Sequence, residues 1–397
     1  MYIAILGRQP ALGTAELECV YGSEAIARFS DQSATLKADA FSIGQFGGIQ
    51  KAGRVVAEIH GDWRRVSQKI VTEYTNTWSN FDGKITLGIS TYGFDVSTRE
   101  IQKTGIVLKQ KLKKSGVSLR LIPNPGLTLN TAISHHNKLG LSHNKVELLV
   151  VRGRNGKVIV AESTGAQNIT AYTKRDQERP KRDAFVGMLP PKLAQIMINL
   201  ARPQQVAVVG AAPVNEPLRI LDPFCGTGVV LQEAALMGYS VYGTDLADKM
   251  VDFSRTNLKW LANTHRVEVN STLEQGDAMD MKWQQPIDSV VGESYLGQPF
   301  SAPPSPTKLS EVRRNCDHII SSFLRNISGQ LKSGTPLCIA IPAWKDINGT
   351  FTHLSLIEKL DDLGFEKHKF KLVSPDDLLY FREDQVVARE LLVLIKA

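Results

Sequence analysis

Apolar positions in the second half of the chain alternate between short runs and helical stripes. The runs predict strands at residues 218–221, 240–243, 267–269, 289–291 and 336–341, with helices between them. Two further runs, 370–373 and 391–395, are expected to form a terminal antiparallel pair. This alternation predicts a doubly wound α/β sheet with right-handed connections.

The first half mixes strands and helices in two smaller groups. Strands at 2–6 and 55–59 and a helix at 11–21 predict an α+β unit over residues 1–60, in which Glu16 and Glu18 are interpreted as a solvated helix face. The second group, residues 61–165, is predicted to hold helices at 63–74 and 101–114, strands at 85–89 and 117–122, and a hairpin of 146–152 and 157–161 around Asn155-Gly156.

Two segments join these groups to the second half. Residues 166–187 are rich in charge and poor in apolar side chains, which predicts a linker on the surface. Residues 188–201 predict a helix, since Pro190 and Pro191 suit a first turn and an apolar stripe follows.

Composition excludes several protein classes. A chain of 397 residues is longer than one domain needs, and 42% hydrophobic and 22% charged residues are typical of soluble globular proteins. No apolar run is long enough for a membrane span, and residues 1–13 lack the features of a secretory signal. The four cysteines form no CxxC pair and the eight histidines show no ligand spacing, so we expect a cytoplasmic protein with no metal.

The net charge of +7 is unevenly distributed. Residues 1–200 contain 27 Lys and Arg against 16 Asp and Glu, while acidic residues are in excess in the remainder. A basic first half predicts a polyanionic partner. The candidate contacts are Lys109, Lys111, Lys113 and Lys114 on the predicted helix 101–114, Arg120 on the next strand, and Arg175 and Arg179 in the linker. An ordinary solvated face is the open alternative.

The most informative stretch is the strand, glycine turn and helix at 218–237. Asp222 ends the strand, Gly226-Thr227-Gly228 forms the turn, and the helix begins at Val229. Such a turn is the ligand-binding position of an open α/β sheet. It has neither GxGxxG spacing nor the GK[ST] of a phosphate-binding loop.

The stretch Asp222-Pro-Phe-Cys-Gly-Thr-Gly228 resembles the first motif of class I S-adenosylmethionine-dependent methyltransferases, especially those acting on exocyclic amines of nucleic-acid bases. The resemblance implies that Asp245 accepts the ribose hydroxyls and Asp277 meets the adenine amine. The whole implied cofactor set is Asp222, Phe224, Cys225, Gly226, Thr227, Gly228, Asp245, Leu246, Asp277 and Ala278. We interpret Cys225 as a packing residue, because no basic neighbour in sequence would activate its thiol.

The acceptor motif is altered. Amine methyltransferases of this kind carry Asp/Asn-Pro-Pro-aromatic after the fourth strand, which holds the amine and stacks on a flipped base. Here the segment reads Gly292-Glu-Ser-Tyr-Leu-Gly297. Alignment without gaps puts Glu293 on the acid position, whereas a shift by one puts Tyr295 on the aromatic and Gly292 on the acid. Glu293 and Tyr295 are the predicted catalytic residues; loss of their catalytic role is the alternative.

The first half adds a second resemblance. The lysine-rich helix, the strand Ser118-Leu119-Arg120, the hairpin and the exit Gln167-Asn168-Ile169 resemble a THUMP domain, an RNA-binding module of tRNA-modifying enzymes. Residues 5–18 resemble the ferredoxin-like domain that precedes it. The implied domains are ferredoxin-like (1–60), THUMP-like (61–165), a linker (166–187) and a Rossmann-like methyltransferase domain (188–397).

Together these features resemble the THUMP-containing tRNA guanine-N2 methyltransferases. The resemblance implies transfer of a methyl group from S-adenosylmethionine to the N2 of a guanosine at tRNA position 10. Two alternatives remain at this point: an N6-adenine methyltransferase acting on DNA or rRNA, and an RNA-binding protein that keeps the cofactor fold without transfer. The need for an activator protein partner is open.

Overall fold

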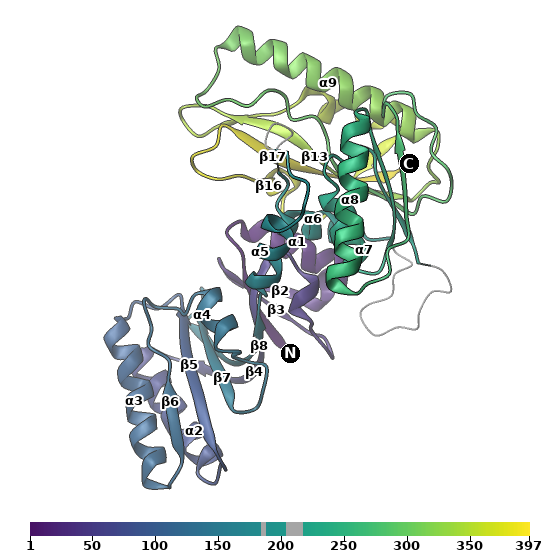
Figure 1. The fold of residues 1–397 in the computed structure, drawn as a ribbon. Coiled ribbons are helices and arrows are strands. Elements are labelled where there is room, and N and C mark those ends of the chain that lie inside the picture. The colour runs from purple at the N-terminus through teal and green to yellow at the C-terminus, as the bar shows by residue number, and fades with distance from the viewer. Residues whose placement is uncertain (184–187, 204–216) are drawn as a thin grey trace. The chain divides into compact units, whose positions relative to one another are not determined.

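The computed structural model describes residues 1–183, 188–203 and 217–397 (Figure 1). The chain divides into two compact units. The first unit comprises residues 1–10, 22–44 and 48–171, and the second comprises 11–21, 45–47 and 172–397. The last four residues of the predicted linker, 184–187, and residues 204–216 of the predicted methyltransferase domain lie outside the described residues.

A single sheet organises the first unit. Its strands are β1 (Tyr2–Leu6), β2 (Ile26–Ser30), β3 (Ser33–Leu36), β4 (Ile49–His60), β5 (Lys84–Tyr92), β6 (Ser118–Leu121), β7 (Lys145–Arg152) and β8 (Lys157–Ala166), in the order β2-β3-β1-β4-β8-β7-β5-β6. Helices α2 (Trp63–Trp78) and α3 (Thr98–Lys114) pack their apolar residues on this sheet, and α4 (Thr131–His136) follows β6. Because β4 pairs with β8, the predicted domains 1–60 and 61–165 share one sheet.

The second unit contains a mixed sheet with helices on both faces. Its strands are β9 (Arg219–Asp222), β10 (Ser240–Asp245), β11 (Ser271–Gln275), β12 (Ser289–Glu293), β13 (Pro336–Lys345), β14 (Phe351–Thr352), β15 (Phe365–Lys367), β16 (Leu379–Tyr380) and β17 (Val387–Lys396). The main order is β11-β10-β9-β12-β13-β17-β15, with β9 to β13 parallel and β17 antiparallel. The strand order reverses between β9 and β12, which is where such sheets bind ligands.

Two apolar cores stabilise this sheet. Helices α6 (Pro191–Leu200), α7 (Val229–Leu236) and α8 (Asp248–His265) contribute to one cluster, and α9 (Pro306–Ser328) contributes to the other. The predicted doubly wound α/β class is therefore confirmed. No helix in the described ranges is long and apolar enough to cross a membrane.

Two predicted strands are wrong in position. The run 267–269 follows α8 as a loop, and β11 begins only at Ser271. Because β11 is an edge strand whose side chains are half-buried or exposed, it lacks the apolar run that a buried strand shows. The run 370–373 forms no strand; β15 at Phe365–Lys367 pairs with β17 instead.

The helix α1 (Pro10–Tyr21) belongs to the second unit, and its acidic residues are buried. Glu16 accepts hydrogen bonds from the side-chain amide of Asn199 at 2.8 Å and the backbone N–H of Gly47 at 2.9 Å. Glu18 accepts from the backbone N–H groups of Lys371 and Leu372. The interpretation of this face as solvated is wrong, since each carboxylate finds buried donors far away in the sequence.

The predicted linker is partly a helix with buried cations. Helix α5 (Ile169–Gln177) positions Arg175, whose guanidinium donates from Nε to Glu233 at 2.6 Å and stacks over the Tyr172 ring at 4.7 Å. Arg179 is only 2% exposed. The prediction that these two arginines lie on the surface is wrong, because both side chains are buried.

Candidate active site

The glycine turn between β9 and α7 has a close-packed geometry. Gly228, the residue before α7, has a φ of 79°, a conformation that side chains disfavour. A Cβ at this position would lie 2.8 Å from the Ser254 hydroxyl. Asp222 accepts the backbone N–H of Phe224 at 3.1 Å, and Cys225 donates its N–H to the Thr244 carbonyl. The backbone of the turn therefore lies against β10 and α8 and has little room to change.

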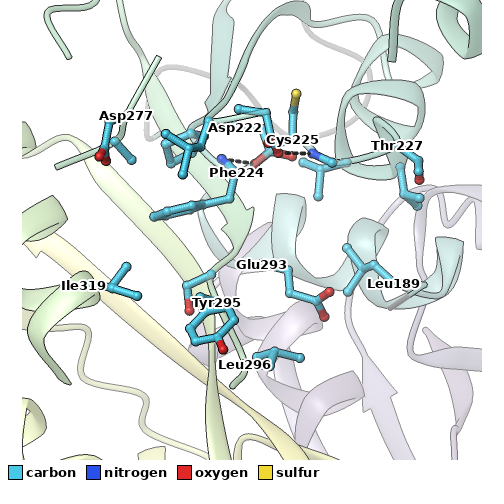
Figure 2. Close-up of a pocket in the computed structure, with 18 of the residues that line it drawn as sticks. Leu189, Asp222, Phe224, Cys225, Thr227, Asp277, Glu293, Tyr295, Leu296 and Ile319 are labelled. Carbon is cyan, nitrogen blue, oxygen red and sulfur yellow. Dashed lines mark hydrogen bonds between the residues drawn. The ribbon is translucent and has the colours of Figure 1, made fainter. Parts of the chain in front are cut away.

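A cavity of about 560 Å³ opens at the carboxyl ends of β9, β10 and β12. Figure 2 shows Glu293, Tyr295 and Leu296 on one side of it and Asp222, Phe224 and Cys225 on the other. Its lining includes these predicted residues: Asp222, Phe224, Cys225, Gly226, Thr227, Asp245, Leu246, Asp277, Ala278, Glu293 and Tyr295. Gly228 does not line the cavity; it closes the turn at the start of α7. The size of the cavity suits a small-molecule ligand.

Asp245 connects the turn to the next strand. Its two carboxylate oxygens accept the backbone N–H groups of Gly226 and Ala247, each at 2.9 Å. Burial raises its pKa, and these two hydrogen bonds act against the rise. Asp277, which follows β11, accepts the backbone N–H of Met279 at 2.9 Å. Both carboxylates are thus oriented by backbone donors, and both line the cavity.

Asp222 is the most buried carboxyl group of the cavity. Burial raises its pKa well above the usual range, the N–H of Phe224 lowers it, and the nearby charges of Asp245 and Glu293 raise it further. No cationic side chain pairs with Asp222 in the described part of the chain. A cationic ligand in the cavity would favour its ionised form. Burial also raises the pKa of the Cys225 thiol, which keeps it protonated as expected of a packing residue.

The acceptor segment enters the cavity from Glu293 onward. Glu293 ends β12 and forms an ion pair with Arg389 of β17. Gly292 does not line the cavity, and a Cβ there would lie 2.5 Å from Asp222 Oδ1. Of the two alignments considered, the structure therefore places the acid of the ungapped one in the cavity.

The neighbouring residues are held differently. Ser294 donates its hydroxyl to the Ala340 carbonyl at 2.9 Å and is buried, whereas Tyr295 is 44% exposed. Gly297 has a φ of 81° and ends the cavity-lining segment. An exposed ring at the edge of a cavity is available to stack on a planar ligand.

Sequence reasoning missed several residues of the lining and the partner of Glu293. Leu189 and Ile319 line the cavity from outside the motifs, and apolar residues at these positions carry no signal of a site. Arg389 touches Glu293 from a strand at the end of the chain. Arg389 precedes the predicted strand 391–395, and nothing in the sequence indicates the pairing, because the pairing depends on the sheet order.

The predicted basic residues of the first unit are exposed to solvent. Lys109, Lys111, Lys113, Lys114 and Arg120 are all exposed. A groove of about 690 Å³ runs between α2 and α3 and includes Arg64, Lys103 and Lys111 in its lining. No salt bridge engages these cations within the described residues. Unpaired cations on one helix pair suit contact with phosphates.

Part of the second unit is similar to a known protein family. Residues 215–363 match the family model described as a methyltransferase domain. The second unit contains a methyltransferase domain. The described part of the matched range contains β9 to β13 and the glycine turn, and it supplies every residue of the cavity lining except Leu189.

Curated relatives of this chain include two proteins of the same name. The tRNA (guanine(10)-N2)-dimethyltransferase of Methanothermobacter thermautotrophicus is 32% identical over 174 residues, or 43% of this chain and 44% of that protein. The protein of the same name from Methanocaldococcus jannaschii is 28% identical over 221 residues, or 54% of this chain and 56% of that protein. The chain thus spans about half the length of these curated relatives.

The fold likeness extends beyond the methyltransferase domain. The structure of TrmN from Thermus thermophilus matches with a TM-score of 0.52 and 16% identity, covering 100% of this chain and 99% of that one. A possible methylase from Clostridium difficile 630 matches with a TM-score of 0.50 and 14% identity, covering 98% and 97%. At this identity the comparison establishes a shared fold and no more.

Proposed function

We propose that this protein transfers a methyl group from S-adenosylmethionine to the exocyclic N2 of a guanosine in tRNA, at position 10. The observation that carries the proposal is the cavity in which the turn after β9, Asp245 and Asp277 face the acceptor segment that begins at Glu293. The relatives named tRNA (guanine(10)-N2)-dimethyltransferase support the substrate. A single cavity thus has one side for a methyl donor and another for an acceptor.

The donor side fits S-adenosylmethionine, which supplies an activated methyl group on a sulfonium. Asp245 would accept the ribose hydroxyls, and Asp277 the adenine amine. Asp222, buried without a cationic partner among the described residues, would face the positive charge of the ligand. The close turn at Gly226 to Gly228 brings backbone rather than side chains to the ligand.

On the acceptor side, Glu293 would accept a hydrogen bond from the guanine amine, and Tyr295 would stack on the flipped base. The accepted hydrogen bond turns the lone pair of the nitrogen toward the methyl carbon. The N–C bond forms as the S–C bond breaks, and the proton then leaves the nitrogen to water. Glu293 therefore orients the amine and does not need to remove its proton beforehand.

The exposed cations of the first unit would hold the tRNA. The lysines of α3, Arg120 and the groove between α2 and α3 offer charge without fixed partners among the described residues, which suits phosphate contacts. This unit is proposed to be THUMP-like. The protein would act in the cytoplasm, where tRNA is processed, with or without an activator protein.

Methylation of unmodified tRNA tests the proposal. Purified protein is incubated with labelled S-adenosylmethionine and unmodified tRNA, and the digested nucleosides are identified. We expect labelled N2-methylguanosine or its dimethylated form, and its loss in Glu293→Ala. The matched control is Glu366→Ala, an exposed glutamate on β15. Label on another nucleoside would contradict the guanine assignment, and cofactor binding with no label on tRNA, rRNA or DNA would contradict the activity.

A further inference from the structure

The carboxylate of Glu293 is held by an arginine from the last strand of the chain. Arg389 donates through Nε to Oε1 of Glu293. The two side chains are 12% and 14% exposed. A carboxylate withdrawn from water to this extent requires a partner, because an unpaired buried charge is costly. The pair therefore links the acceptor segment to a strand that contributes no residue to the cavity lining.

Sheet register explains how Arg389 reaches Glu293. Glu293 lies beside Ala340 on β13, and Ala340 lies beside Leu391 on β17. Arg389 is two residues from Leu391, so its side chain leaves the same face of the sheet. Arg389 itself lies beside Pro342, and Ala340, beside Glu293, carries only a methyl group. The long arginine side chain thus spans the width of β13 to reach the end of β12.

The second carboxylate oxygen of Glu293 is left for a ligand. Oε2 has no hydrogen bond to any side chain or backbone group in the described ranges, and Glu293 lines the cavity. A glutamate has one more rotatable bond than the aspartate that stands at this position in the motif it resembles. Bonding of Oε1 to Arg389 removes that extra freedom and presents Oε2 as a fixed acceptor.

We propose that Arg389 is a positioning residue, which holds Glu293 so that Oε2 meets the acceptor amine. The inference rests on the proposed function, since the amine is the acceptor named there. Arg389 acts through Glu293, because it is absent from the cavity lining. Its removal should leave the carboxylate able to rotate, and misplacement of a catalytic group by about 1 Å lowers a rate by roughly 100-fold.

The test compares Arg389→Met and Arg389→Lys with the wild-type protein in tRNA methylation and in binding of S-adenosylmethionine. We expect kcat to fall about 100-fold in Arg389→Met, while the Kd for the cofactor changes less than about threefold. Arg389→Lys keeps a charged donor and should recover roughly tenfold of the loss. The double variant Glu293→Gln/Arg389→Met should be no slower than Glu293→Gln, because both changes remove one interaction.

The matched control is Arg219→Met. Arg219 is a half-buried arginine of the same sheet that donates to Thr272 and stacks over Tyr242, away from the cavity lining. Its loss should lower thermal stability and leave kcat within about twofold. A general weakening of the sheet would instead reduce kcat in both methionine variants.

Each outcome decides between the two claims. If the wild-type protein methylates no tRNA, the proposed function and this inference both fail. If the wild-type protein is active and Arg389→Met keeps its kcat, or loses cofactor affinity as strongly as kcat, the positioning role fails while the proposed function stands. Should Arg389→Met not fold, Arg389→Lys decides: a lower kcat with unchanged cofactor affinity supports the role, and a wild-type kcat overturns it.

Discussion

The proposed donor and acceptor sides of the cavity hold their side chains by different means. On the donor side, the turn after β9 is shaped by glycine conformation, and Asp245 is oriented by backbone N–H groups. On the acceptor side, Glu293 is held by the side chain of Arg389, which lies 96 residues further along the chain. Local backbone geometry can be encoded in a short motif, whereas a side-chain pair across a sheet needs the whole fold. The difference explains why the donor motif is easy to read and the acceptor motif is not.

The largest effect should come from Gly228→Ala on the donor side. The added Cβ would lie 2.8 Å from the Ser254 hydroxyl, at a φ of 79°. We expect the free energy of unfolding to fall by about 2–4 kcal/mol, and cofactor binding to be lost. The control is Gly238→Ala, which has a φ of 89° but no atom within 4 Å of its Cβ. Gly238→Ala should lower the free energy of unfolding by only about 1–2 kcal/mol and keep cofactor binding. If both variants lost equal stability, close packing of the turn would be unimportant. Both are measured by chemical unfolding and calorimetry.

Asp222→Asn tests the charge on the same side. Burial raises the pKa of Asp222, so the folded protein favours its protonated form and loses stability as the pH rises through that raised pKa. The variant should therefore be more stable than the wild-type protein at neutral pH. Its cofactor affinity should fall about tenfold, because the cationic ligand favours the ionised carboxylate.

The pH dependence provides the decisive measurement for Asp222. In the wild-type protein, cofactor affinity should weaken as the pH falls through the raised pKa, and this slope should be reduced in Asp222→Asn. Binding is followed by calorimetry at several pH values. If cofactor affinity depended on pH as strongly in Asp222→Asn as in the wild-type protein, Asp222 would not face the positive charge of the cofactor.

Tyr295→Ala affects the acceptor side alone. Loss of stacking on the flipped base should raise the KM for tRNA by about 5- to 100-fold, corresponding to roughly 1–3 kcal/mol, with the Kd for S-adenosylmethionine unchanged. Tyr295→Phe keeps the ring and should behave like the wild-type protein. If the KM for tRNA and the Kd for S-adenosylmethionine both changed, the two sides of the cavity would not be independent.

The smallest effect is expected outside the cavity. Lys113→Ala, on the exposed face of α3, should weaken tRNA binding about twofold to fivefold and reduce the salt dependence of log K by close to one. Cofactor affinity should stay constant. Lys359→Ala, an exposed lysine of the second unit, is the control. If both variants showed the same salt dependence of tRNA binding, α3 would not contact tRNA.

Hydrophobic periodicity and the turn motif were sufficient to predict much of the methyltransferase fold. The strands that became β9, β10, β12 and β13 are buried, so their apolar runs are continuous and visible. Asp222, Asp245 and Asp277 stand at or just after strand ends, and parallel strands bring such ends to one edge. The edge strand β11 was misplaced because half-buried positions carry no such run.

Charged residues were where sequence reasoning failed. Glu16, Glu18, Arg175 and Arg179 look like a solvated helix face or a surface linker, yet all four are buried. In a sequence, a charged residue that water solvates cannot be distinguished from one that pairs with a distant residue in the folded protein. Asn199 binds Glu16 across 183 residues, and Glu233 binds Arg175 across 58.

The sequence by itself determined most of the buried strands and helices, the α/β class and the residues of the turn after β9, because these depend on local periodicity and on short motifs. The tertiary structure alone decided that α1 belongs to the second unit and that Glu293 pairs with Arg389. Such pairs arise from sheet order and from the cost of leaving a buried charge without a partner. That cost acts only after the chain has folded, so no spacing in the sequence records it.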